Sequence, residues 1–215
     1  MRESELSEVE KIIGYVFKNR SLLNQALTNE SYVNEHGGTG NERLEFLGDG
    51  LLNFIVAESL YNSENSDEGV LSKERAEIVS RSPLSKAVDD MGLMRYYLLG
   101  KGAEKNLQSI SEKFKSNIFE SVLGAIYLDG GMKSAKAFVK FKLLDKRYRA
   151  ARDYKSELKE RAEANGIGYS FKTEPSERGF SSVLSVCGKE FYGSGRKKID
   201  AEQQAAKNAL DSRAI

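Results

Sequence analysis

Apolar residues in the first two thirds of the chain recur every three or four positions, the spacing of an amphipathic helix. This spacing predicts helices over residues 3–17, 21–33, 41–61, 70–80, 82–92, 109–131 and 132–150, with Ser21 as the cap of the second. Glycine-rich or polar breaks separate them, at 35–40 and 62–69 among other places. No alternating strand pattern interrupts this part. An all-α domain is therefore expected over residues 5–147.

The pattern changes after residue 153. A short amphipathic helix is predicted over residues 154–166, followed by alternating or aromatic-rich stretches at 169–176, 180–188 and 189–195 that are typical of strands. A closing helix is predicted over 196–212. These elements predict a second domain of α+β class, with the order α-β-β-β-α, over residues 153–215. A basic hinge, residues 148–152, would join the two domains.

Composition changes this picture little, but it excludes several classes of protein. Lys plus Arg (33) nearly balance Asp plus Glu (32), yet residues 140–152 alone carry six basic side chains and one acidic one. A single cysteine, Cys187, excludes an internal disulfide framework, and a single histidine, His36, argues against a zinc site. No apolar run reaches transmembrane length, and the charged start does not resemble a signal peptide. A cytoplasmic protein with no membrane partner is expected.

Three carboxylates stand at the head of one of the most apolar segments. Glu42, Glu45 and Asp49 fall within about 60° of one another on a helix, and the same face continues into Leu52 and Val56. A solvated face would explain carboxylates but not these aliphatic neighbours. Because an ionised carboxylate in an apolar setting is costly without a partner, a bound cation is the alternative explanation.

The helix predicted over 109–131 repeats this arrangement. Asn117 and Glu120 lie three positions apart on one face, and Gly124 on the same face would let another helix come close. Two such helices packed together would form an all-oxygen cluster, which suits Mg²⁺ better than zinc. Together with an RNA-binding module, which the basic helix start described next indicates for the second domain, such a cluster suggests metal-assisted hydrolysis of phosphodiester bonds.

The stretch "GSGRKK" opens the closing helix of the second domain. Glycines allow a close backbone approach, a helix N-terminus favours anions, and the cations Arg196, Lys197 and Lys198 follow. Lysines at the start of a helix can also be ordinary solvated residues. Their place in an α-β-β-β-α module favours phosphate binding.

These motifs carry a resemblance to a known family. "NERLEFLGD" resembles the signature of ribonuclease III, and "FESVLGAIYLDGG" resembles the second acidic motif of that family. "VLSKERAEIVS" and "RSLLNQALTNESY" fit as well, and the tail resembles the double-stranded-RNA-binding domain that follows the nuclease domain in the bacterial enzymes. The resemblance implies an all-α ribonuclease III-type endonuclease domain followed by a small double-stranded-RNA-binding domain.

The resemblance also implies roles for individual residues. Glu45, Asp49, Asn117 and Glu120 match the positions of the family's Mg²⁺ ligands, with Asp49 and Glu120 as catalytic carboxylates and Glu42 as a supporting acid. Mn²⁺ would be able to substitute. The implied reaction cuts double-stranded RNA to 5′-phosphate and 3′-hydroxyl ends, in processing of precursor rRNA, messenger RNA and other transcripts.

Further implications concern partners. The family works as a homodimer, and the aromatic residue that matches Phe46 inserts into the partner subunit. In the tail, Lys155, Lys159 and Glu160 on the first helix are candidate contacts in the RNA minor groove, where A-form RNA is recognised by its shape.

The chain also departs from the family pattern. Asn117 stands where the family normally has Asp, Asn29 and Glu30 stand where it usually has His and a basic residue, and Ile199 replaces a usual lysine. A catalytically weakened or inactive double-stranded-RNA-binding protein is therefore a second hypothesis. A dimeric scaffold that uses the acidic face for protein contacts is a third.

Overall fold

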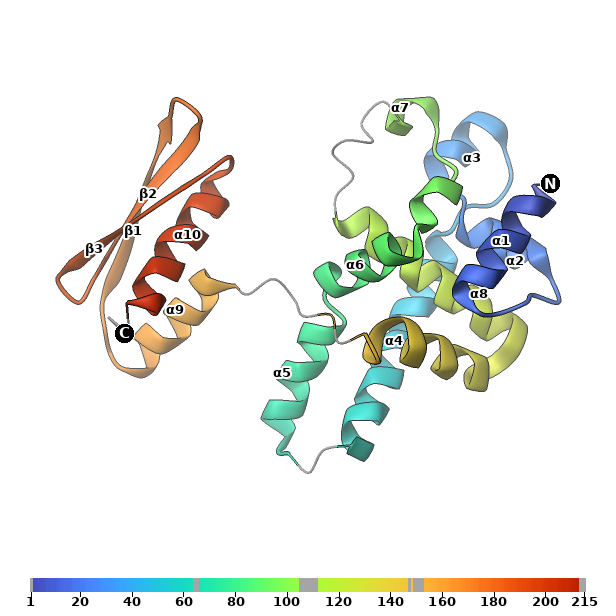
Figure 1. Ribbon diagram of the computed structural model, residues 1–215, viewed down its shortest axis with the longest axis horizontal. Coiled ribbons are helices and arrows are strands. Elements are labelled where there is room, and N and C mark those ends of the chain that lie inside the picture. The colour runs from blue at the N-terminus through green and yellow to red at the C-terminus, as the bar shows by residue number, and fades with distance from the viewer. Residues whose placement is uncertain (1, 64–65, 105–111, 147, 149–152, 213–215) are drawn as a thin grey trace. The chain divides into compact units, whose positions relative to one another are not determined.

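The structure, a computed structural model, describes residues 2–63, 66–104, 112–146, 148 and 153–212. Contacts along the chain divide it into two units, one up to residue 150 and one after it. The predicted hinge lies, apart from Tyr148, outside the described residues. The first unit is helical and the second has the order α-β-β-β-α, so the predicted fold classes are confirmed (Figure 1).

The first unit consists of α-helices, a 3₁₀ turn (η1) and a terminal π-helical turn (η3). Their bounds are α1 Glu3–Ile13, α2 Arg20–Ala26, α3 Glu30–His36, α4 Glu42–Ser63, α5 Glu68–Ile78, α6 Arg81–Met91, η1 Leu93–Tyr96, α7 Lys101–Glu104, α8 Glu112–Val139 and η3 Lys140–Leu144. The apolar core lies around α4 and α8, which make the most extensive contact between any two helices of this unit. In Figure 1, α5 runs back beside the C-terminal half of α4.

Two glycines allow α4 and α8 to cross at backbone contact distance. A Cβ on Gly48 would lie 1.8 Å from the carbonyl oxygen of Glu120, and a Cβ on Gly124 would lie 2.4 Å from that of Leu44. Neither position could carry a side chain without separating the helices. The prediction that Gly124 lets another helix approach is therefore confirmed.

The helix predicted over residues 21–33 is wrong, because the structure has two helices there. The carboxamide of Asn19, not the hydroxyl of Ser21, caps α2 by accepting the Ser21 N–H, and Asn29 caps α3 by accepting the Ser31 N–H. Between them Thr28 forms a parallel bridge with Leu98. A short polar side chain at a cap competes with the helix for backbone groups, and here it ends one helix and begins another.

The predicted boundary near Gly130 and Gly131 corresponds to a break inside α8. Gly131 has φ 72° and ψ −175°, outside the helical region, and the helix resumes after it. The segment 105–111, which contains the start of the predicted helix 109–131, lies outside the described residues. The turns η1 and α7 were not predicted, since four residues carry too little periodicity to show.

The second unit is an antiparallel sheet with two helices on one face (Figure 1). Its elements are α9 Tyr154–Ala164, β1 Tyr169–Ser176, β2 Gly179–Val186, β3 Lys189–Gly195 and α10 Lys198–Asp211, with strand order β1-β2-β3. A small core lies between sheet and helices, made of Leu158, Leu184, Val186, Ala205, Ala206, Ala209 and Leu210. None of the described helices of either unit is long and apolar enough to cross a membrane.

Candidate functional sites

The predicted carboxylates gather where α4 crosses α8. Glu45 and Asp49 on α4 lie close enough to Glu120 on α8 for their charges to act on it. Glu45 and Glu120 are half-buried, whereas Glu42 and Asp49 are exposed. The acidic face is therefore partly exposed to solvent, more than the sequence pattern suggested. It lies beside the point where the two helices cross.

The crowding of like charges shows in the pKa of Glu120. Burial, followed by the nearby charges of Asp49 and Glu45, raises this pKa to about 8, and Arg81 opposes the rise. Burial also raises the pKa of Glu45, to which Glu42 and Asp49 add, while Lys113 and Asn117 lower it. Carboxylates held together at this cost suit the binding of a cation, whose charge would offset their repulsion.

Two amides already occupy part of this carboxylate cluster. The side chain of Asn117 hydrogen-bonds to Glu45, and Nδ2 of Asn53 donates to the carboxylate of Asp49 at 3.0 Å. Within the described residues no three His, Cys, Asp or Glu side chains converge as they would around a metal ion. The expected all-oxygen cluster is thus present as neighbouring donors on two helices, not as a closed coordination shell.

The donor set itself fits a hard divalent ion. Carboxylate and amide oxygens are the ligands that Mg²⁺ takes, and it commonly uses one or two carboxylates while keeping several waters. Glu45, Asp49 and Glu120 offer carboxylates, and Asn117 offers an amide oxygen, from two helices whose spacing the glycine crossing fixes. The residues present therefore fit the implied metal.

A buried amide network fixes the start of α4 against α8. Nδ2 of Asn41, a residue only 2% exposed, donates to the hydroxyl of Tyr97 and to Oγ of Ser121, each at 3.0 Å. Ser121 in turn donates to the carbonyl oxygen of Asn117 at 2.6 Å, and Asn29 donates to Tyr97 at 3.1 Å. Because Ser121 follows Glu120 directly, this network sets the register of the two carboxylate-bearing helices.

Sequence reasoning missed the polar neighbours of the cluster. Asn53 stands four residues after Asp49, a spacing that places two side chains together on a helix and could have revealed it. Lys113 stands four residues before Asn117 on α8, a spacing that could likewise have revealed it. Arg81 and Tyr97 approach from other elements, and nothing in their local sequence indicates it.

Phe46 lies beside the acidic face and points to solvent. It is 83% exposed, and Leu128 nearby is 53% exposed. Both belong to an open depression of mixed character, part apolar and part polar, lined by Gln25, Glu42, Arg43, Leu44, Phe46, Leu47 and Leu128. An exposed aromatic ring beside such a depression is typical of a contact surface.

In the second unit, the basic start of α10 is solvent-exposed at Arg196, Lys197 and Lys198. The glycines that precede it are needed for packing, because the start of α10 fills the space that a side chain would take. A Cβ on Gly193 would lie 2.2 Å from the Ala201 carbonyl oxygen, and one on Gly195 would meet Asp200 and Ala201. The glycines therefore seat the start of α10 on β3.

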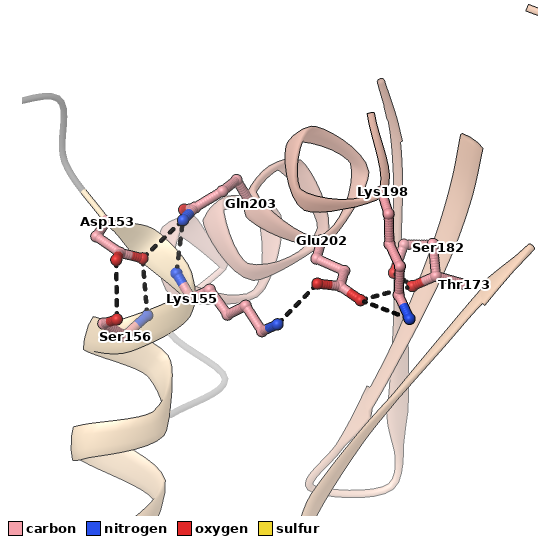
Figure 2. Close-up of polar contacts among 8 residues, drawn as sticks. All are labelled: Asp153, Lys155, Ser156, Thr173, Ser182, Lys198, Glu202 and Gln203. Atoms are coloured by element: carbon pink, nitrogen blue, oxygen red, sulfur yellow. Dashed lines mark hydrogen bonds and ion pairs between the residues drawn. The ribbon is translucent and has the colours of Figure 1, made fainter. Parts of the chain in front are cut away.

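The candidate contacts on α9 have different surroundings. Lys159 and Glu160 are exposed, and Lys159 pairs with Glu163 at 3.8 Å. Lys155 is half-buried, and its ammonium lies 2.7 Å from the carboxylate of Glu202 on α10 (Figure 2). Glu202 was not predicted as part of any site.

Comparison with known proteins agrees with this architecture. Residues 19–147 match the family model described as Ribonuclease-III-like, and residues 154–212 match the double-stranded RNA binding motif. The chain is 38% identical to Ribonuclease 3 of Bdellovibrio bacteriovorus, over 94% of each chain. It is 37% identical to Ribonuclease 3 of a Geobacillus species, over 97% of this chain and 91% of that one.

Solved structures match the first unit. A 2.2 Å crystal structure of the nuclease domain of ribonuclease III from Campylobacter jejuni, 29% identical, covers 70% of this chain and 100% of its own, with a TM-score of 0.61. A second structure of that domain, 32% identical, covers 64% of this chain and 95% of its own, with a TM-score of 0.60. The description of the second names a flexible region involved in dimer formation.

The raised pKa of Glu120 predicts an unusual dependence of stability on pH in the metal-free protein. Between the ordinary carboxyl pKa of 4.5 and the raised value of about 8, the folded state holds a proton that the unfolded state releases. The free energy of unfolding should therefore fall as the pH rises through this range. Urea unfolding in EDTA, followed by circular dichroism, measures it.

The Glu120→Gln variant should lose this part of the pH dependence. Glu112→Gln, at the exposed first turn of the same helix, is the matched control and should keep the wild-type dependence. Identical pH profiles for the wild type and Glu120→Gln would contradict the electrostatic description of the cluster.

Proposed function

This chain belongs to the ribonuclease III family, and from that membership we propose that it hydrolyses phosphodiester bonds of double-stranded RNA with Mg²⁺. The products would carry 5′-phosphate and 3′-hydroxyl ends. The observation that supports this most is the set of carboxylates on α4 and α8, held together at a glycine crossing in a chain that also carries a double-stranded RNA binding motif. Processing of precursor rRNA and messenger RNA in the cytoplasm is part of the same proposal.

Family membership implies dependence on a divalent metal ion. In our proposal Glu45, Asp49, Glu120 and the amide oxygen of Asn117 hold Mg²⁺. The ion, when bound, supplies a water of lowered pKa and neutralises charge at the leaving 3′-oxygen. Glu42, exposed at the start of α4, adds negative charge beside Glu45 and has a supporting role.

Protein groups would orient the reaction. Asn53 holds the Asp49 carboxylate through a 3.0 Å hydrogen bond, and Ser121 holds the turn of α8 that carries Asn117. Arg81 is an exposed cation whose charge acts on Glu120, a position that also suits an RNA phosphate. Binding of the duplex falls to the tail, through Lys155, Lys159, Glu160 and the basic start of α10.

We propose that the active form is a homodimer in which Phe46 of each subunit enters the depression of the other. The ring is 83% exposed in the single chain, and the depression beside it is lined by Leu44, Leu47 and Leu128 with a polar edge of Gln25, Glu42 and Arg43. Two copies related by a twofold axis would bury both rings, as an isologous interface requires. A dimer-forming region is also named for the Campylobacter nuclease domain.

A second candidate function follows from Asn117. Its side chain hydrogen-bonds to Glu45, so its NH₂ group has an acceptor, and its oxygen can face an ion but brings no charge. A site with one charge fewer than the family pattern holds Mg²⁺ more weakly. The alternative is therefore a double-stranded-RNA-binding protein with little or no cleavage.

Replacement of Glu120 by alanine tests the enzyme proposal. Glu120→Ala should reduce cleavage of a labelled RNA hairpin at least about 100-fold, because it removes a proposed ligand of the metal ion. This factor corresponds to about 2.7 kcal/mol of activation barrier. Binding of the same hairpin, measured in EDTA, should stay within about twofold, because the tail supplies the phosphate contacts. Glu112→Ala is the matched control. Full cleavage by Glu120→Ala would remove the site assignment.

Restoring the family's charge at position 117 separates the two candidate functions. Asn117→Asp should raise the single-turnover rate in Mg²⁺ at least about tenfold, equal to about 1.4 kcal/mol of barrier, and lower the Mg²⁺ midpoint. Mn²⁺ should partly rescue the wild type. Equal rates and equal midpoints for both proteins would show that Asn117 is a neutral substitution.

The dimer proposal is tested by sedimentation of Phe46→Asp. A carboxylate in the depression should dissociate the dimer at micromolar concentration, since aromatic anchors commonly dominate an interface. Val16→Asp changes another apolar side chain, 72% exposed, and should leave the dimer intact. A wild-type chain that sediments as a monomer would refute the proposal.

A further inference from the structure

Glu202 is a buried carboxylate in a unit with little core to spare. Its side chain is only 7% exposed, although it lies in the second turn of a helix with ample access to solvent on its other face. Burying a charge costs free energy that an ion pair rarely returns in full, whereas such groups can fix one arrangement among several. The burial of Glu202 is therefore better explained by a role in positioning its partners than by a gain in stability.

The partners of Glu202 come from α9, from β1 and from the start of α10 (Figure 2). One carboxylate oxygen lies 2.7 Å from Nζ of Lys155 on α9. The other accepts a hydrogen bond from Thr173 on β1 at 3.1 Å and lies 4.0 Å from Nζ of Lys198 at the start of α10. Thr173 is also 2.9 Å from the hydroxyl of Ser182 on β2. One side chain thus joins both helices to the sheet.

The side chain of the next residue, Gln203, ties α10 to the start of α9. Its Oε1 accepts the N–H of Lys155 at 3.2 Å, and its Nε2 donates to Asp153 at 2.6 Å. Asp153 caps α9 through the N–H and hydroxyl of Ser156. Figure 2 shows these contacts as one continuous network of hydrogen bonds and ion pairs from the start of α9 to the start of α10.

The hydrogen-bond network carries candidate RNA contacts on both helices. Lys155 is held between the Glu202 carboxylate and the ring of Phe171, whose centroid is 5.5 Å from Nζ. Lys198 continues the exposed basic run at the start of α10, and Gly193 and Gly195 seat that start on β3. The network therefore fixes how far apart the cations of α9 and α10 stand.

From this arrangement we propose that Glu202 is a positioning residue that sets the spacing between the α9 and α10 cations, and thereby the preference for A-form RNA over B-form DNA. The inference rests on the proposed binding of double-stranded RNA by the tail. A-form and B-form duplexes carry the same phosphates at different groove spacings, so cations held at a fixed separation fit one duplex better than the other, in addition to any contact with the 2′-hydroxyl groups. Freed lysines would still attract either duplex.

The test compares binding of an RNA duplex and a DNA duplex of the same sequence to the full chain in EDTA, by fluorescence anisotropy. Glu202→Gln keeps the shape and removes the charge. It should lower the RNA-to-DNA preference about tenfold, the factor for one hydrogen bond to a charged group, while DNA binding stays equal or becomes tighter. Circular dichroism and thermal unfolding verify the fold.

Two further variants separate positioning from charge. Gln203→Ala removes the tie between α9 and α10 without changing the charge, and it should also lower the preference, to a smaller extent. Glu190→Gln removes a charge from an exposed position on β3, where Glu190 accepts a hydrogen bond from the Tyr192 hydroxyl at 2.7 Å. This variant should shift both affinities by one common factor.

The outcomes distinguish this inference from the proposed function. A wild type that does not bind the RNA duplex would overturn both, whereas a wild type that binds both duplexes equally would overturn the inference alone. A wild type that prefers RNA, with Glu202→Gln or the folded Gln203→Ala keeping that preference, would overturn the inference alone. A selective loss of RNA binding in both variants supports it.

Discussion

The candidate active site depends on how closely two helix backbones can approach. Gly48 and Gly124 lie on opposite helices, each against a backbone carbonyl of the other, and these two contacts hold α4 and α8 closer than side chains would permit. The carboxylates project from the same two helices beside this crossing. Their separation is therefore fixed by the absence of two Cβ atoms, and the Asn41 network fixes the rotation and register that remain.

Much of the fold could be predicted because its information is periodic and local. The long apolar helices, the α-β-β-β-α order of the tail and the three strands follow from spacing alone. The division between α2 and α3 could not, because it combines the Asn29 cap of α3 with the bridge from Thr28 to Leu98, a residue far along the chain. The helical spacing of residues 21–33 favoured one helix, but the chain forms two, with the bridged residue Thr28 between them.

The site shows the same limit. Helical spacing placed Glu45 and Asp49 on one face, and a recognised motif assigned them roles that the proposed experiments address. The exposure of Asp49, the amide hydrogen bond from Asn117 to Glu45 and the approach of Arg81 to Glu120 could not be predicted. Each depends on which elements meet in space. The glycines before α10 are a sharper case, since a motif typical of phosphate binding also serves helix packing here.

The charge balance of the tail has a consequence for turnover. After residue 152 the chain carries 11 basic and 10 acidic side chains, and Glu202 offsets part of the positive charge that Lys155 and Lys198 present. A unit with so little excess charge attracts nucleic acid weakly from a distance and gains affinity chiefly when several contacts fit at once. In the proposed enzyme, a severed duplex would offer fewer such contacts than an intact one. The weakness of the general attraction would then favour release of the fragments and leave the protein free for the next molecule.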